Sequence, residues 1–270
     1  MDRLSLTLQS RESSRRKLYR RRLVCQAAAV FLLAALAAGC SQSQEAGQKD
    51  AQAAYKLGVA FLTEGRPGPA LGPLTTAETL APDDPEILNA LGIAYWQRRE
   101  LGMAEQKFKK AVAVKPDYSE AWNNLGAMYV DQGRYQEAVP ILENALKNLL
   151  YGTQERALTN LGWCLFKLGR LGEAERRFRD AIEIAPRFPL SRKLLGILLK
   201  EKGDCTEALT QLDEAARTLP GDAEIQLNRG LCLLSLGKRP SAKEAFQRAW
   251  QLAPGNEVGQ LAKSYLDRLE

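Results

Sequence analysis

The sequence contains no histidine. Histidine is the side chain that most often transfers protons near pH 7, and it is the commonest metal ligand. Its absence excludes histidine-dependent catalytic triads and histidine-containing zinc motifs. The sequence also lacks a phosphate-binding loop, a paired-carboxylate pocket and a cluster of ligands with metal spacing. We therefore expect a non-enzyme that has no metal site and no small-molecule substrate.

Net charge is also missing from most of the chain. The sequence holds 38 Lys and Arg against 32 Asp and Glu, a formal charge of +6. Eight of the basic and two of the acidic residues lie in residues 1–39, which leaves 30 of each kind in residues 40–270. The positive charge therefore belongs to the N-terminal segment and does not predict a nucleic-acid partner. With 45% hydrophobic residues, the remainder is expected to fold around a core.

The N-terminal segment has the order of a secretory signal. A basic stretch, SRRKLYRRRL, precedes an apolar run over Val24–Ala38, which is shorter than the roughly 20 residues of a membrane-spanning helix. The small residues Ala37, Ala38 and Gly39 before Cys40 resemble the lipobox of bacterial lipoproteins. That resemblance implies cleavage after residue 39 and a covalent lipid on Cys40, and we expect no other cofactor.

Several features of this segment bear on export and location. It can instead be an uncleaved anchor with an incidental cysteine, and its SRRKLYR motif fits either a plain basic signal or twin-arginine export. Ser41 follows the cysteine, and by the sorting rule of enterobacterial lipoproteins this implies the outer membrane, facing the periplasm. Residues 40–50 are polar and are expected to form a tether. Several acyl chains on one residue would hold the chain firmly at the membrane.

A repeat of 34 residues organises residues 51–256. A Leu-Gly pair such as Leu91-Gly92 recurs, with Arg229-Gly230 as its last, variant copy. Twelve residues after each glycine stands an alanine, then a large apolar residue, then a second alanine, and a proline closes five of the six units. This pattern resembles the tetratricopeptide repeat. The resemblance implies two antiparallel helices per unit, which approach closely at the glycine and the alanines.

We therefore expect an all-α fold, a right-handed superhelical solenoid of six tetratricopeptide repeats followed by a capping helix. The proline is expected to end each second helix. The capping helix is expected to cover the last repeat with Val258, Leu261, Tyr265 and Leu269. The predicted segments are a signal peptide (1–39), an acylated cysteine and tether (40–50), repeats at 51–84, 85–118, 119–152, 155–188, 189–222 and 223–256, and a cap (257–270).

The cysteines are expected to be free thiols. Cys25 would leave with the leader. Cys164 and Cys232 occupy the same position two repeats apart, which is too far for a disulfide in a stacked solenoid. Cys205 is expected in a turn. We therefore expect mostly buried, unpaired thiols.

The second, fifth, ninth and twelfth residues of each first helix form a stripe that faces away from the partner helix, and in this fold the stripe lines a concave groove. Aliphatic and aromatic side chains in it predict binding of an apolar or extended peptide. The candidate partner-binding residues are Asn89, Ile93 and Trp96 in repeat 2, Asn123, Ala127 and Val130 in repeat 3, and Thr159, Trp163 and Phe166 in repeat 4.

Alternative roles stay open for these residues. The tryptophans and Phe166 can instead pack against neighbouring repeats, and Asn123, Asn124 and Asn160 can stack helices rather than bind a peptide backbone. A basic cluster in repeat 4 is interleaved with acidic residues, which favours a solvated helix face over a nucleic-acid patch. The cluster comprises Arg170, Arg176, Arg177 and Arg179, with Glu173, Glu175 and Asp180 among them.

The interval between repeats 3 and 4 is 36 residues, and the expected proline is missing. Two extra helical residues would rotate the next apolar stripe by about 200°, so they must lie outside the helices. We expect Gly152 to end the preceding helix in a left-handed cap and Thr153 to cap the next one. The second helix of repeat 3 is expected to run slightly longer than its counterparts.

The stretch LYGTQERALTNLGWC, residues 150–164, resembles the corresponding region of type IV pilus pilotins of the PilF, PilW and Tgl kind. Those proteins are outer-membrane lipoproteins with six tetratricopeptide repeats, and they assist assembly or localisation of the secretin channel through which the pilus passes. The resemblance covers the chain from Cys40 onward. It implies a pilotin in type IV pilus biogenesis with secretin subunits as partners.

Two other classes of function compete with this interpretation. One is a periplasmic adaptor lipoprotein for peptidoglycan enzymes or for outer-membrane protein assembly, which uses the same fold and anchor. The other is an enzyme, which the missing histidine disfavours. No nucleic-acid partner is expected in either case.

Overall fold

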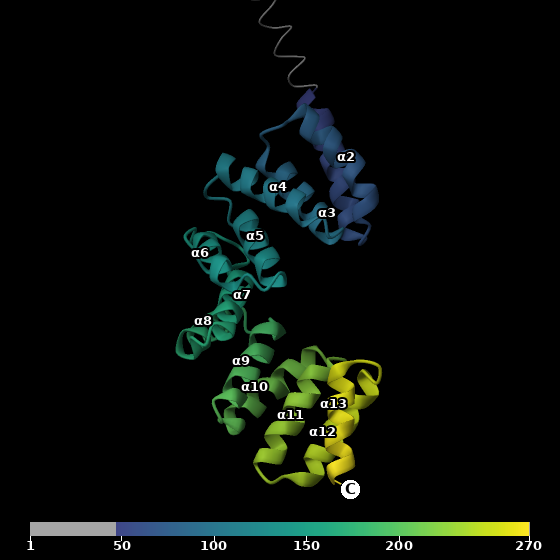
Figure 1. Cartoon of the computed structure of the whole chain (residues 1–270). Coiled ribbons are helices and arrows are strands. Elements are labelled where there is room, and N and C mark those ends of the chain that lie inside the picture. Colours follow the sequence, from purple (N-terminus) through teal and green to yellow (C-terminus); the bar gives the residue numbers. More distant parts are fainter. Residues whose placement is uncertain (1–46, 270) are drawn as a thin grey trace, which may run out of the picture. The chain divides into compact units, whose positions relative to one another are not determined.

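The computed structural model describes residues 47–269, which form helices joined by short turns (Figure 1). The predicted signal peptide and Cys40 lie outside the described residues. Within them there is no strand, and no helix is long and apolar enough to cross a membrane. The described residues divide into two compact units, one that ends at Pro82 and one that begins at Asp83.

The first unit contributes one helical hairpin to the described part. Its first helix covers residues 47–63, and α2 (Pro67–Leu80) follows. Residues 47–50 were predicted to belong to the tether but are helical, so the predicted tether is too long at this end. Extending a formed helix adds one hydrogen bond for each residue that is ordered and needs no apolar contact. Accordingly, residues 48–50 are exposed.

The second unit consists of five hairpins and a final helix. We call the two helices of a hairpin helix A and helix B. The pairs are α3 (Pro85–Gln97) with α4 (Leu101–Val114), α5 (Ser119–Asp131) with α6 (Tyr135–Ala145), α7 (Gln154–Lys167) with α8 (Leu171–Ile184), α9 (Pro189–Glu201) with α10 (Cys205–Thr218), and α11 (Ala223–Ser235) with α12 (Arg239–Leu252). The last helix is α13 (Glu257–Leu269). Each helix A packs against the next helix A, so these helices form a continuous layer.

Close contact between helices A and B depends on the glycine of the repeat. Phe178 of α8 is fully buried, and a Cβ atom added to Gly162 would lie 2.7 Å from its Cε1. At Gly92 the corresponding distance to Phe108 Cε1 is 2.5 Å. The side chains of helix B thus occupy the space that the glycine leaves, as the repeat pattern predicted.

The prolines end the B helices as predicted. Val114 is the last residue of α4, two residues before Pro116, and Ile184 is the last of α8, two residues before Pro186. Proline disfavours the helical conformation of the residue before it and has no backbone N–H. The chain therefore leaves the helix at this point and turns into the next hairpin.

The segment between α6 and α7 differs from the prediction. Helix α6 has 11 residues whereas α8 has 14, so the second helix of repeat 3 is shorter, not longer. Gly152 is not among the glycines with positive φ, and the Thr153 side chain makes no capping hydrogen bond. The predicted left-handed cap and threonine cap are therefore wrong.

Two side chains account for the early end of α6. Asn148 accepts a hydrogen bond from the Leu150 N–H at 3.0 Å and donates through Nδ2 to the Asp117 carbonyl at 3.3 Å. Tyr151 is buried against Ala145 and Ala157. These contacts fold residues 146–153 back onto the preceding hairpin, which absorbs the two extra residues outside the helices.

The final helix covers the last hairpin, as α13 lies beside α11 and α12 (Figure 1). The Tyr265 ring stacks on Phe246, with 4.9 Å between centroids, and Ala262 and Leu266 are buried. Leu261 is 46% exposed, so its predicted place on the covered face is wrong. The buried face is centred one residue later, on Ala262 and Leu266.

Candidate protein-binding surface

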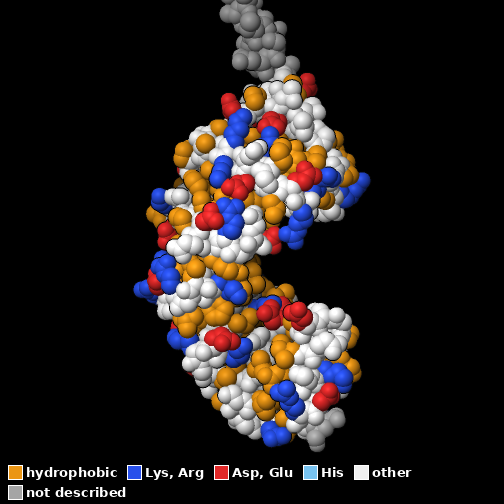
Figure 2. Space-filling view, viewed as in Figure 1, with side chains coloured by type: hydrophobic (Ala, Val, Ile, Leu, Met, Phe, Trp, Pro, Cys, Tyr) orange, Lys and Arg blue, Asp and Glu red, His pale blue; other side chains and the backbone are white. Residues whose placement is uncertain are grey.

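The exposed side of the helix A layer carries a row of apolar residues at the ninth and twelfth positions of the repeats. We call this row the A-helix stripe. Its predicted members are all half-buried in the structure. Figure 2 shows hydrophobic side chains gathered around the part of the molecule where α7 lies. The stripe consists of Ile93 and Trp96 on α3, Ala127 and Val130 on α5, and Trp163 and Phe166 on α7.

Trp163 and Phe166 form the aromatic centre of the stripe. Their ring centroids are 5.4 Å apart with an interplanar angle of 35°, and Lys167 Nζ lies 5.4 Å from the Trp163 ring centroid. Both rings pack against the core, and both keep part of their surface exposed. Packing between repeats and partner contact are therefore compatible roles for these two residues.

Trp96 is hydrogen-bonded to the next repeat through its indole N–H. Its ring meets Phe108 edge-on at 6.5 Å, and its Nε1 donates a hydrogen bond to Asp131 Oδ2 at 3.3 Å. The same carboxylate oxygen accepts from Arg99 Nη1 at 2.5 Å. The indole orientation is thus set by the end of α5, which leaves its apolar face for a partner.

The fifth-position residues of the predicted site stack the repeats instead of facing solvent. Asn89 and Asn123 are 7% and 6% exposed. Asn124 Nδ2 donates to Asn89 Oδ1 at 3.0 Å, and Asn160 Nδ2 donates to Asn123 Oδ1 at 3.2 Å. The helix-stacking alternative for the asparagines is therefore the one that the structure adopts.

Thr159 makes a similar polar contact between successive A helices. It is 1% exposed, and its hydroxyl lies 2.7 Å from the Ser191 hydroxyl of the next helix A. Burial of a polar group costs free energy unless the group is hydrogen-bonded, and each of these side chains finds a partner on the adjacent repeat. Asn89, Asn123 and Thr159 thus hold successive A helices in register.

Repeat 5 holds a lysine at the fifth and another at the twelfth position of its helix A, Lys193 and Lys200, and the prediction included neither. Lys193 Nζ lies 2.7 Å from both Asp222 Oδ2 and Glu224 Oε2. Burial lowers its pKa, but the two carboxylates raise it more, so the net shift is upward and the ammonium stays charged. Lys200 Nζ donates to Asn228 Oδ1 at 2.8 Å. Continuing the register into repeat 5 would have found both lysines.

The basic cluster of repeat 4 is neutralised by its own acidic residues. Arg170 Nη2 lies 2.7 Å from Glu173, and Arg179 Nη2 lies 2.9 Å from Glu175 and 2.7 Å from Glu207. These are partly exposed pairs within and between helices B. The predicted solvated helix face is confirmed.

The three described cysteines are free and buried, as predicted. Cys205 is the first residue of α10 rather than part of a turn. Burial raises the pKa of Cys164 and of Cys232 to about 12, so neither thiol is a nucleophile near neutral pH. Among residues 47–269 no group of His, Cys, Asp and Glu has an arrangement that could hold a metal ion.

Comparison with known proteins supports the repeat assignment. Two family models of the tetratricopeptide repeat match residues 117–187 and 193–257. The type IV pilus assembly protein PilF of Pseudomonas aeruginosa is 28% identical over 189 residues, which is 67% of this chain and 75% of the relative.

Two solved structures share the fold over most of their length. The structure of Pseudomonas aeruginosa PilF has a TM-score of 0.75 at 22% identity and matches 82% of this chain and 99% of its own. The structure of PilW, described as a widely conserved type IV pilus biogenesis factor, has a TM-score of 0.71 at 22% identity and matches 78% and 97%. The predicted all-α solenoid of tetratricopeptide repeats is confirmed.

Proposed function

We propose that this tetratricopeptide-repeat protein is a non-catalytic assembly factor of type IV pilus biogenesis, a pilotin that binds secretin subunits. Two observations support the proposal. The sequence is 28% identical to a type IV pilus assembly protein over 189 residues. The structures of PilF and PilW are matched over 99% and 97% of their lengths, so the likeness extends over whole domains rather than one generic hairpin.

The proposed mode of binding rests on the half-buried apolar residues of the A-helix stripe. Apolar side chains that are half-buried in the free chain can lose the rest of their exposed surface to a partner, and burial of that remaining half contributes about 1 kcal/mol for each aromatic side chain. Trp163 and Phe166 lie in contact and would act together as the anchor. An extended apolar segment of a secretin subunit would lie across α3, α5 and α7.

The proposed location follows from Cys40. Acylation of this residue would anchor the chain in the outer membrane with the repeats in the periplasm, where secretin subunits arrive. Replacing Cys40 with serine should abolish lipid labelling and move the protein out of the membrane fraction. Unchanged fractionation, together with no lipid labelling of the wild type, would refute the anchor.

Deletion of the gene tests the function itself. The proposal expects the loss of secretin multimers and of surface pili, and expects the wild-type chain to restore both. Normal multimers with altered cell-wall hydrolysis would favour the adaptor function instead. Catalytic turnover by the purified protein would contradict a non-catalytic role.

A further inference from the structure

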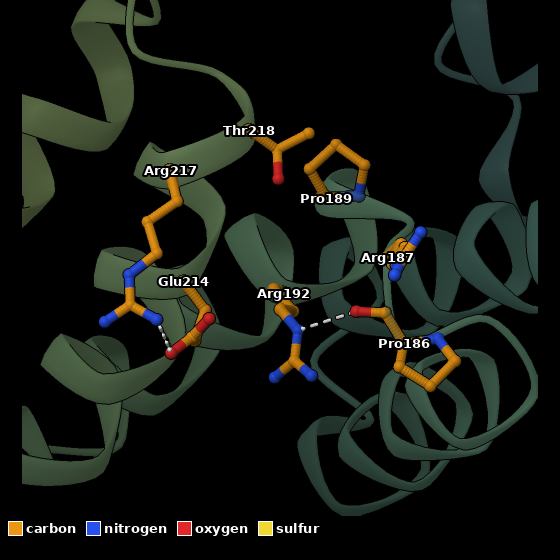
Figure 3. Close-up of a pocket in the computed structure, with 7 residues that line it drawn as sticks. All are labelled: Pro186, Arg187, Pro189, Arg192, Glu214, Arg217 and Thr218. Carbon is orange, nitrogen blue, oxygen red and sulfur yellow. Dashed lines mark hydrogen bonds and ion pairs between the residues drawn. The ribbon is translucent and has the colours of Figure 1, made fainter.

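A pocket of about 320 Å³ opens at the junction of repeats 4 and 5 (Figure 3). Pro186 in the loop before α9, Pro189 at the first position of α9 and Thr218 at the end of α10 all line it. All of its lining residues belong to the second unit. The pocket lies outside the A-helix stripe and shares no residue with it.

An arginine stands beside this pocket at a position where another repeat holds a tryptophan. In repeat 3 the fourth residue is Trp122, whose Nε1 donates to the Pro116 carbonyl at 2.8 Å. In repeat 5 the fourth residue is Arg192, whose Nε donates to the equivalent Pro186 carbonyl at 3.2 Å. The arginine keeps the hydrogen bond of the tryptophan and brings a positive charge to the pocket.

The Arg192 guanidinium is fixed in place. Besides its bond to Pro186, its Nη1 donates to Gln211 Oε1 of α10 at 2.9 Å. Figure 3 shows the guanidinium between the loop and α10. A guanidinium that is held at two nitrogens loses little freedom when it binds an anion through the third, which favours recognition.

Two further arginines give the pocket a net positive charge. Arg187 is exposed beside it, and Arg217 pairs with Glu214 at 2.7 Å. Three arginines and one carboxylate line the pocket, which leaves an excess of two positive charges. An excess of two positive charges does not occur at the equivalent positions of two other junctions, which hold Asp117, Trp122, Asn144 and Lys147, and Gly221, Gln226, Arg248 and Gln251.

We propose that this pocket binds a phosphate monoester group. Such a group carries a charge of about −1.5 to −2 at pH 7, which matches the excess charge of the lining, whereas a carboxylate matches half of it. Arginine forks bind phosphate oxygens through paired, charge-assisted hydrogen bonds. The Thr218 hydroxyl offers a further donor, and the proline rings offer apolar contact to whatever carries the phosphate (Figure 3).

The partial charges of the two helix ends at the pocket do not determine whether it attracts an anion or a cation. Helix α9 begins at Pro189 and α10 ends at Thr218, both at the pocket. The N-terminal end of a helix attracts an anion and the C-terminal end repels it, so the two effects offset each other. Binding therefore depends on the arginines. The phosphate can belong to a soluble phosphomonoester or to a phosphorylated lipid headgroup.

Calorimetric titration of the full chain in nonionic detergent micelles tests the proposal and distinguishes the two sources. The soluble probe is glycerol 3-phosphate, and the lipid probe is phosphatidic acid in mixed micelles, with phosphatidylcholine, a phosphodiester with no net charge, as the reference. Binding of glycerol 3-phosphate identifies a soluble phosphomonoester site. Binding of phosphatidic acid alone identifies a headgroup site, and either result supports the pocket.

Two sets of variants connect the binding to the pocket. Replacing Arg187 and Arg217 together with glutamine should raise the Kd of the bound probe by about tenfold or more. Arg192→Trp introduces the residue type of repeat 3, replaces the guanidinium by an uncharged indole and should abolish binding while the helical content stays that of the wild type. Arg187 and Arg217 are exposed, so their replacement should leave the hairpin packing unchanged.

The matched control replaces Arg239 and Arg248 of α12 with glutamine, which removes the same charge from exposed positions away from the pocket. It should leave the Kd unchanged. The proposal is overturned if neither probe binds, if Arg192→Trp binds as well as the wild type, or if the control weakens binding as much as the pocket variants.

Discussion

At the scale of single residues, the packing of each hairpin depends on a glycine, which has no side chain. Gly162 lies against Phe178, and an added Cβ would come within 2.7 Å of a ring that is fully buried and cannot move aside. Gly172, on the outer face of α8, has no atom within 4 Å of the same added Cβ. The two glycines therefore serve different purposes, although both lie in helices.

We expect Gly162→Ala to lower the free energy of unfolding by about 1–3 kcal/mol, because the methyl group overpacks the contact between helices. Gly172→Ala should instead raise it by up to about 1 kcal/mol, because alanine favours the helix. Urea denaturation followed by circular dichroism measures both changes. Effects of the same sign would show that the packing at Gly162 is looser than described.

The turn between helices A and B contains the one described non-glycine residue with positive φ. Arg99 has φ 65°, at a position where the other repeats hold glycine, as Gly133 does with φ 72°. We expect Arg99→Gly to stabilise the chain by about 1 kcal/mol, since a side chain strains the left-handed conformation. The Arg99–Asp131 pair that is lost has a 72% exposed arginine and contributes little. A lower unfolding midpoint for this variant would contradict the expectation, and Gly133→Ala, measured alongside, should be destabilising.

At the scale of elements, a polar network joins α4 to α5 and the turn after it. Tyr129 donates to Glu105 Oε1 at 2.8 Å, and Arg134 Nη1 donates to Oε2 at 3.0 Å. The Arg134 guanidinium also lies 3.8 Å from the Tyr129 ring centroid. Burial raises the pKa of Glu105, but hydrogen bonds from Lys109, Tyr129 and Arg134 lower it by more. The net effect is a fall of the pKa from 4.5 to about 2.

This network predicts a pH dependence of stability. A carboxyl group whose pKa is lowered by folding stabilises the native state above its unfolded pKa, and the contribution is lost as the pH falls through the folded pKa. For Glu105 the loss runs from about pH 4.5 to about pH 2 and amounts to roughly 3 kcal/mol at most. Urea denaturation at a series of pH values measures it.

Glu105→Gln provides the comparison for this measurement. The variant should be less stable than the wild type at pH 7, and the difference should shrink as the pH falls below 4.5. The other carboxylates titrate in both proteins and cancel in the difference. A difference that is constant over this range would mean that Glu105 does not titrate as described.

The hairpins could be predicted from the sequence, whereas the segment between α6 and α7 could not. The hairpins were predictable because glycine, alanine and proline recur at positions whose steric role is the same in each repeat. The segment between α6 and α7 was not, because Asn148 and Tyr151 act through contacts with Asp117 and Trp122 of the preceding hairpin. These tertiary contacts, rather than the local preference of Gly152 for a left-handed cap, determine the conformation of the segment.

At the scale of the molecule, the A helices carry two neighbouring sets of positions that differ in exposure. The ninth and twelfth positions, such as Trp163 and Phe166, keep exposed apolar surface, as the groove prediction required. The fifth positions, such as Asn123, are buried by a polar partner on the next repeat. Helical periodicity within one repeat predicts which residues share a face, but not which of them a neighbouring repeat will cover.

Trp163→Asp tests whether the A-helix stripe binds the partner. A charge in the middle of the aromatic pair should oppose burial against an apolar segment, whereas the half-exposed position tolerates it in the free chain. Ile184→Asp is the matched control, because Ile184 is 52% exposed but lies on helix B. Both variants should keep the helical content of the wild type.

The deciding measurement is the Kd of the purified full chain for solubilised secretin subunits, with helical content recorded by circular dichroism on the same samples. We expect Trp163→Asp to raise the Kd by about tenfold or more and Ile184→Asp to leave it unchanged. Wild-type affinity of Trp163→Asp, equal weakening by both variants, or loss of helical content in Trp163→Asp would show that the stripe is not the binding surface.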